Sequence, residues 1–185
     1  MEPSVIFIII AAILLLVLIP VFWWIKTGNA FKRKALKIDE ALSGIEVALT
    51  KRWDMLTKLL DVAKGFAAHE KELFSQVIAL RKGMSVEELG QAGAQMDAVA
   101  SRLNVVAENY PQLRSADTFV QLQGGIRDAE QHLQAARRLY NSNVTSFNTA
   151  IAVFPGSIVA NAKHLEKKAL FVAEEAKKAD VEMKF

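Results

Sequence analysis

An uninterrupted apolar run near the N-terminus constrains this chain more than any other feature. Residues 5–25 read VIFIIIAAILLLVLIPVFWWI, which is 21 residues without a charged side chain. As a helix rising about 1.5 Å per residue, the run spans roughly 30 Å, the thickness of a bilayer's hydrocarbon core. A cleaved signal peptide fits less well, because no Lys or Arg precedes the run and no small-residue cleavage site follows it. We expect a transmembrane anchor at residues 1–26 and a helical bundle domain at residues 27–185.

Basic residues gather directly after the apolar run. Two tryptophans end the run, where an aromatic belt meets lipid headgroups, and cations follow that predict contact with anionic headgroups. The predicted lipid-contacting residues are Trp23, Trp24, Lys26, Lys32, Arg33, Lys34 and Lys37. The positive-inside rule favours a single-pass cell-membrane protein with its N-terminus outside and its bundle in the cytoplasm. A single span follows that rule only as a tendency, so the reverse orientation stays open.

Apolar residues spaced alternately four and three apart dominate the next part of the chain. This seam runs from Phe31 to Leu80, and only Arg52 and Glu70 interrupt it with a charge. Such a seam is typical of helices packed as in coiled coils. It predicts one very long helix, bent or broken near Gly65.

A capping box opens the second predicted helix. Ser85 and Glu88 match the S-x-x-E pattern, in which two side chains bond the orphan N–H groups at a helix start. The apolar seam resumes at Leu89 and stops at Tyr110, because Pro111 disfavours helical geometry in the residue before it.

The third predicted helix follows the same apolar spacing. Ser115 or Asp117 is expected to cap it, and its seam extends to Phe154. Asn143 is the one polar residue that interrupts this seam.

A Pro-Gly turn separates the third helix from a fourth. Ser157 is expected to cap this helix, whose apolar face runs to Ala179. Helices joined by short turns lie antiparallel to their neighbours. The predicted fold is therefore all-α: an N-terminal transmembrane helix, then an elongated antiparallel four-helix bundle with coiled-coil-like seams. The longer first and third helices leave apolar surface that a partner or a second copy would cover, and of these we expect a homo-oligomer.

Three polar residues in the seams are candidates for setting helix register and partner choice: Arg52, Glu70 and Asn143. A polar residue at one seam position commonly specifies register at a cost in stability. Two interpretations of Arg52 stay open. Its guanidinium pairs with an acid of another helix or another chain, or it extends its charged end to water.

The residues form no pattern typical of a catalytic, metal or cofactor site. The sequence has no cysteine, and its histidines, His69, His132 and His164, lack a metal-ligand spacing. Gly124 and Gly125 fall inside a predicted helix rather than in a phosphate-binding loop. Basic residues alternate with acidic ones along the bundle, which argues against nucleic-acid binding. We therefore expect no enzyme activity, no cofactor and no metal.

Several blocks of the sequence resemble the LemA family. They include IEVALTKRWD at 45–54, VAKGFAAHE at 62–70, ENYPQLR at 108–114 and ARRLYN at 136–141. The resemblance runs from about residue 30 to residue 172, in the family's order and spacing. It implies a bacterial, single-pass, mainly helical membrane protein, and it supplies no catalytic residues.

Two functional classes fit these features. The favoured hypothesis is a non-enzymatic, membrane-anchored scaffold that self-associates at the bilayer and organises or remodels membrane or recruits partner proteins. The alternative is an accessory or receptor-like subunit that regulates a neighbouring membrane enzyme such as a protease. Co-purification with one such enzyme at fixed stoichiometry, without self-association, would favour the second class.

Overall fold

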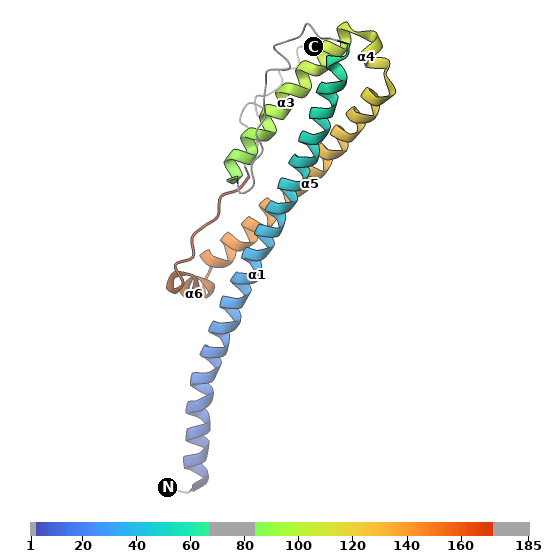
Figure 1. The fold of residues 1–185 in the computed structure, drawn as a ribbon. Coiled ribbons are helices and arrows are strands. Elements are labelled where there is room, and N and C mark those ends of the chain that lie inside the picture. Colours follow the sequence, from blue (N-terminus) through green and yellow to red (C-terminus); the bar gives the residue numbers. More distant parts are fainter. Residues whose placement is uncertain (1–2, 67–83, 172–185) are drawn as a thin grey trace, which may run out of the picture. The chain divides into compact units, whose positions relative to one another are not determined.

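A computed structural model describes residues 3–66 and 84–171 of the chain, and within these ranges every regular element is a helix (Figure 1). This confirms the predicted all-α class with a long apolar helix at the N-terminus. The seam beyond Phe66, including Glu70, and the last part of the predicted fourth helix lie outside the described residues, and the seam residue Phe66 itself is 45% exposed in a turn after α1.

The chain packs as two compact units. The first contains Met1–Asp39 and Ser142–Lys168, and the second contains Glu40–Asn141 and Ala169–Phe185. The two longest helices each contribute residues to both units, because α1 spans Pro3–Lys64 and α5 spans Asp117–Ala152.

Helix α1 joins the apolar run to the predicted seam within one helix of 62 residues. Most of its apolar side chains from Ile6 to Ile25 are exposed, and this stretch is long and apolar enough to cross a membrane. The seam from Phe31 to Ala63 is buried except for two half-buried members. The helix ends one residue before Gly65, which confirms the predicted break at that point.

Helix α3 (Val86–Asn109) begins at the predicted capping box. The Glu88 N–H donates to Ser85 Oγ at 3.2 Å, and the Ser85 N–H donates to the Glu88 carboxylate at 2.7 Å. The seam residues of α3 are buried as predicted, from Leu89 to Val106. The helix stops before Pro111, which then starts the short helix α4 (Pro111–Ser115).

Helix α5 buries or half-buries every residue of the seam predicted for the third helix except Phe154, but its ends differ from the prediction. Asp117 is its first helical residue, whereas Ser115 ends α4. At the other end α5 stops at Ala152, so the predicted seam residue Phe154 is 79% exposed. Ile151 occupies the last buried position instead.

The fourth helix is much shorter than predicted. Helix α6 (Gly156–Ala162) has seven residues and its N-cap is Pro155, not Ser157. His164 has a positive φ of 50°, and residues 165–171 are not helical. The prediction of a helix through residue 171 is therefore wrong. Asparagine side chains of α5 bond the backbone of this segment and replace the hydrogen bonds that a helix would supply.

Four helices share a core in the second unit. Its buried members come from α1, α3, α4 and α5: Leu59, Ala63, Leu103, Val106, Ala107, Leu113 and Phe119. Because each helix buries one stripe of apolar side chains against the others, the second unit is a helical bundle.

Candidate functional site

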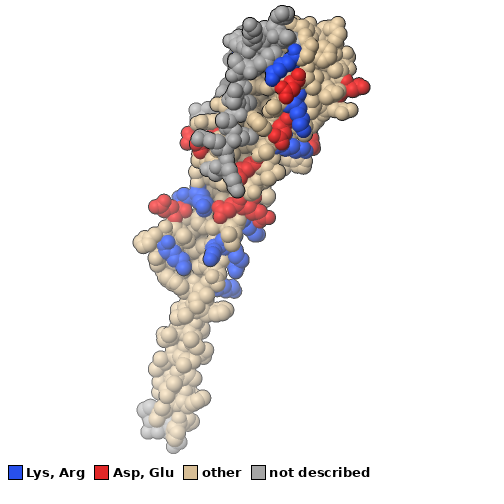
Figure 2. Space-filling view, viewed as in Figure 1, with Lys and Arg blue, Asp and Glu red and all other residues tan. Residues whose placement is uncertain are grey.

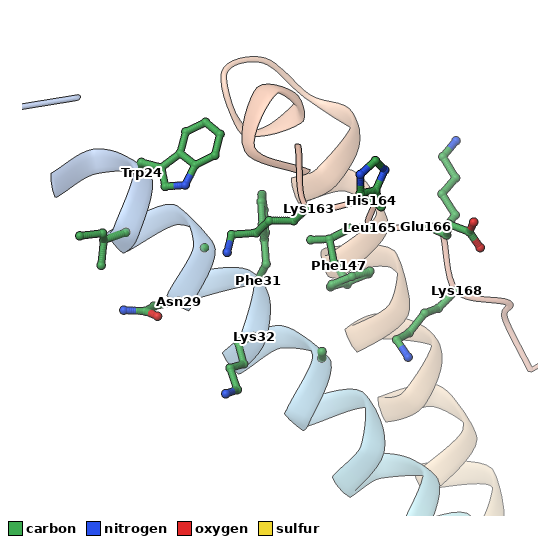
Figure 3. Close-up of a pocket in the computed structure, with 14 residues that line it drawn as sticks. Trp24, Asn29, Phe31, Lys32, Phe147, Lys163, His164, Leu165, Glu166 and Lys168 are labelled. Carbon is green, nitrogen blue, oxygen red and sulfur yellow. The ribbon is translucent and has the colours of Figure 1, made fainter. Parts of the chain in front are cut away.

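A groove with a volume of about 1010 Å³ lies in the first unit, beside the part of α1 at which the apolar stretch ends (Figure 3). Helix α1, helix α5 and the segment after α6 form its walls. Apolar side chains line one part of it: Trp24, Ile25, Phe31, Ala35, Phe147 and Leu165. Trp24 and Ile25 are the last residues of the apolar stretch, so the groove begins where that stretch ends.

Cations line the rest of the groove. The cations are Lys32 of α1 and three lysines of the segment after α6, Lys163, Lys167 and Lys168. The same segment also contributes His164 and one acid, Glu166, to the lining. Figure 2 shows the same change of chemistry on the surface: the lowest part carries no Lys or Arg, and basic groups gather directly above it.

Lys163 reaches across the groove to α1. A Cβ at Gly28 would lie 2.9 Å from Lys163 Cε and 3.4 Å from its Nζ. The missing side chain at Gly28 therefore gives the lysine room to lie against the helix. Figure 3 shows Lys163 extended beside Phe31.

Asn148 of α5 holds the lysine-bearing segment at Lys168. Its Oδ1 accepts a hydrogen bond from the Lys168 N–H, and its Nδ2 donates one to the Lys168 carbonyl, both at 2.9 Å. One amide side chain thus exchanges two bonds with an irregular backbone, much as a neighbouring strand does. The backbone of Lys168 is satisfied without a helix.

In the second unit, Asn141 makes the same pair of bonds with Phe171. Its Oδ1 accepts from the Phe171 N–H at 2.7 Å, and its Nδ2 donates to the Phe171 carbonyl at 2.9 Å. The neighbouring Tyr140 hydroxyl donates to the Ala169 carbonyl at 3.1 Å. The Phe171 ring is buried, and the Arg137 guanidinium lies 4.7 Å from its centroid.

The sequence-predicted lipid-contacting residues are divided between two hollows and the open surface. Trp24 and Lys32 line the groove. A smaller hollow of about 330 Å³ is lined by Ala30, Arg33, Lys34, Lys37, Asn143 and Ser146. Trp23 is half-buried and Lys26 is exposed, and neither lines these hollows.

Asn143, the polar residue in the seam of α5, contacts α1 in the smaller hollow. Its Nδ2 donates to the Lys37 carbonyl at 2.9 Å, and one turn away the Lys34 ammonium donates to Ser146 Oγ at 2.6 Å. The Asn143 side chain therefore donates its hydrogen bond to a backbone oxygen of the same unit. Its role in register stays a prediction.

Arg52 lies in the core of the second unit, 4% exposed, and it has two acidic partners. Its Nη2 is 2.5 Å from Asp97 Oδ1 of α3, and its Nη1 is 2.9 Å from Glu130 Oε2 of α5. The guanidinium thus pairs with acids of two other helices of the same chain, and it does not extend to water. Whether it also sets register stays a prediction.

The neighbouring residue Lys51 makes a contrasting ion pair at the surface. Its ammonium lies 2.5 Å from the Asp128 carboxylate, and both side chains are exposed. The hydrogen bond from Lys51 and its positive charge hold the pKa of Asp128 below the usual value, and His132 adds to this effect. Within the ranges that the structure describes, no group of three His, Asp or Glu side chains is placed to hold a metal ion.

The family model of LemA matches residues 41–185. The chain belongs to the LemA family. Protein LemA of Metamycoplasma hominis is 29% identical over 171 residues, which cover 89% of this chain and 78% of that protein. Magnetosome protein MamQ of Magnetospirillum gryphiswaldense is 24% identical over 162 residues, which cover 71% of this chain and 60% of that protein. These matches confirm the family predicted from the sequence blocks and indicate no catalytic family.

Together with the apolar stretch of α1, membership in the LemA family indicates a membrane-associated helical protein. Sequence periodicity did not predict that lysines of the segment after α6 line the groove, because it assigned these lysines to a fourth helix. The lysines at 163, 167 and 168 follow the Pro-Gly turn in the sequence. Alternating antiparallel helices would make the third helix parallel to the first and place this turn far from the apolar run, so the predicted topology gives no reason to bring these lysines to the groove.

Proposed function

We propose that this LemA family member is a non-enzymatic scaffold that α1 anchors in the cell membrane and that self-associates at the bilayer. In this role it organises or remodels membrane, or it recruits partner proteins. One observation supports the proposal above others: a single helix of 62 residues contains both the exposed apolar stretch and the buried seam of the bundle. The apolar stretch therefore continues into the seam within one helix, with no separate linker segment between them.

Anionic headgroups are the proposed lipid partners of the first unit. Five cations of α1 follow the apolar stretch within about three turns: Lys26, Lys32, Arg33, Lys34 and Lys37. Near an anionic surface each contributes about 1 kcal/mol of attraction. This charge would hold the start of the bundle at the membrane surface.

A second copy of the chain is the proposed protein partner. Helices α1, α3 and α5 of the second unit each keep a large apolar side chain at least half exposed: Val47 at 67%, Val105 at 56% and Leu139 at 56%. Water contact with such side chains is unfavourable, and covering them would favour association. The relation to a protein named for the magnetosome also supports a role in membrane organisation.

The mass of the full-length protein in detergent tests the proposal. We expect light scattering to give an assembly of two or more copies, and we expect Val47→Lys to shift it toward the single chain. Ser43→Lys is the matched control, because it adds the same charge at a polar, exposed position of α1. A single chain at all concentrations would contradict self-association. A single chain bound to one membrane enzyme at fixed stoichiometry would instead support the accessory-subunit alternative.

A further inference from the structure

We infer that the groove of the first unit binds the phosphate-bearing headgroup of one anionic phospholipid, whose acyl chains lie along the apolar stretch of α1. This site deepens the proposed function and rests on the membrane anchor in it. It differs from general attraction to a charged surface, because residues distant in sequence together line one groove with an apolar and a cationic part.

The charge of the groove suits a phosphate. Four lysines and one glutamate line it, so positive charge dominates. Among the described residues none of the four lysine ammonium groups has a carboxylate partner within ion-pair distance. Figure 3 shows the Glu166 carboxylate on the side of the segment away from α1, whereas Lys163 extends toward α1. Ammonium groups that lack a carboxylate partner are the usual point-charge ligands of a phosphate.

The apolar part of the groove suits a lipid rather than a free phosphate. Trp24 and Ile25 belong both to the apolar stretch and to the groove lining. A tryptophan at the end of an apolar stretch is typical of the membrane interface, where the indole ring contacts acyl chains and the indole N–H contacts polar groups. A lipid covers both parts of the lining at once. A free phosphate ion would leave the tryptophan and isoleucine side chains in contact with water.

Two uncharged residues shape the site. Gly28 opens the wall of α1, since any Cβ there would meet the Lys163 side chain. Asn148 holds the backbone of Lys168 through two hydrogen bonds. Both are positioning residues, because they act on the lysines and not on the headgroup. They make it possible to alter the groove without changing any charge.

Native mass spectrometry of the full-length protein, released from detergent micelles, tests the site. The protein is titrated with phosphatidylglycerol, with phosphatidylcholine and with glycerol 3-phosphate. We expect one phosphatidylglycerol per chain to be retained, in clear preference to phosphatidylcholine, and no retention of glycerol 3-phosphate. The number of chains and the number of lipids are separate mass increments. A failure of lipid binding is therefore distinguishable from a failure of self-association.

Gly28→Leu fills the groove at constant charge. We expect it to lower phosphatidylglycerol retention on the order of tenfold, which corresponds to about 1.4 kcal/mol. Gly124→Leu is the matched control, because a Cβ at Gly124 would meet nothing within 4 Å and the gain in helix propensity is the same. Retention that is equal in the two variants would overturn the site.

Charge removal gives a second, independent comparison. Lys163→Gln with Lys168→Gln should lower retention by at least the same factor, since each cation near anionic lipid contributes about 1 kcal/mol. Lys58→Gln with Arg127→Gln removes the same charge from exposed positions of the second unit and should leave retention unchanged. Equal loss in both double variants would show diffuse attraction and overturn the site, as would equal retention of phosphatidylcholine or of glycerol 3-phosphate.

Discussion

At the scale of single residues, one arginine links three helices of the second unit. Arg52 of α1 uses separate nitrogens to contact Asp97 of α3 and Glu130 of α5, while its buried Nε makes no hydrogen bond among the described residues. The two acids are 34% and 31% exposed, so each keeps partial contact with water. A buried ion pair contributes little net stability, but losing one member leaves the other charge without compensation. The loss of unfolding free energy on a substitution therefore depends on which of the three charged side chains, Arg52, Asp97 and Glu130, remain.

Replacing Arg52 alone should be costly. We expect Arg52→Leu to lower the free energy of unfolding by about 3 kcal/mol, because two carboxylates then lose their cation. Adding Asp97→Asn and Glu130→Gln should restore most of that loss, since the two negative charges that faced the arginine are then removed as well. Lys51→Leu, which removes the exposed pair with Asp128, should have little effect. Denaturant unfolding of the full-length protein in detergent measures all of these variants.

A small and equal effect of Arg52→Leu and Lys51→Leu would contradict this account of Arg52. The triple variant also addresses register. If Arg52 sets the alignment of the helices, the triple variant should stay folded but form an assembly of altered mass. If its mass is unchanged, the arginine stabilises the bundle without specifying its partners.

At the scale of elements, the helices that the sequence predicts well are those defined by local patterns. The seam predicts α1, α3 and α5, and the Ser85–Glu88 box predicts where α3 begins, because these signals lie within a few residues of what they determine. The segment after α6 is different. Ala162, Leu165 and Ala169 have helical spacing, yet the bonds that hold this segment come from Asn141 and Asn148, distant in sequence.

The spacing of the two asparagines suits a segment that is not helical. Asn141 and Asn148 are seven positions apart in α5, a rise of roughly 10 Å at 1.5 Å per residue. Their partners, Phe171 and Lys168, are three residues apart, which also spans roughly 10 Å in an extended chain. The periodicity of apolar residues along the sequence cannot reveal this match, because the match relates the rise per residue of a helix to the rise per residue of a segment that is not helical. For the same reason the groove lysines could be predicted only in part.

Each asparagine should protect its own partner residue. We expect Asn148→Leu to raise amide hydrogen exchange at Lys168, and Asn141→Leu to raise it at Phe171, each on the order of tenfold, because a lost hydrogen bond costs about 1 kcal/mol or more. Leucine keeps the side-chain volume and removes both bonds. Asn104→Leu is the control, since among the described residues the Asn104 side chain accepts a bond from the Gln123 side chain and bonds no backbone group. Unchanged exchange at Lys168 and Phe171 would show that packing, and not the amides, holds the segment.

At the scale of the whole molecule, charge on the two sides of the apolar stretch predicts how the chain crosses a membrane. Glu2 is the one charged side chain before the stretch, whereas five Lys and Arg side chains follow within twelve residues, from Lys26 to Lys37. Cations resist translocation, so the side that carries them tends to stay in the cytoplasm. The bundle, the groove and the smaller hollow would then all face inward.

Two reporter fusions at the C-terminus test this orientation, one active only in the cytoplasm and one active only outside. We expect activity from the cytoplasmic reporter alone. Replacing the five cations by glutamine should give activity from both reporters, because it removes the bias, whereas five such replacements in the bundle should not. Activity from the external reporter alone would reverse the orientation. Since the groove begins at Trp24, at the bundle end of the apolar stretch, the same result decides which leaflet supplies its lipid. An inward bundle requires the cytoplasmic leaflet, where anionic lipids give a negative surface potential.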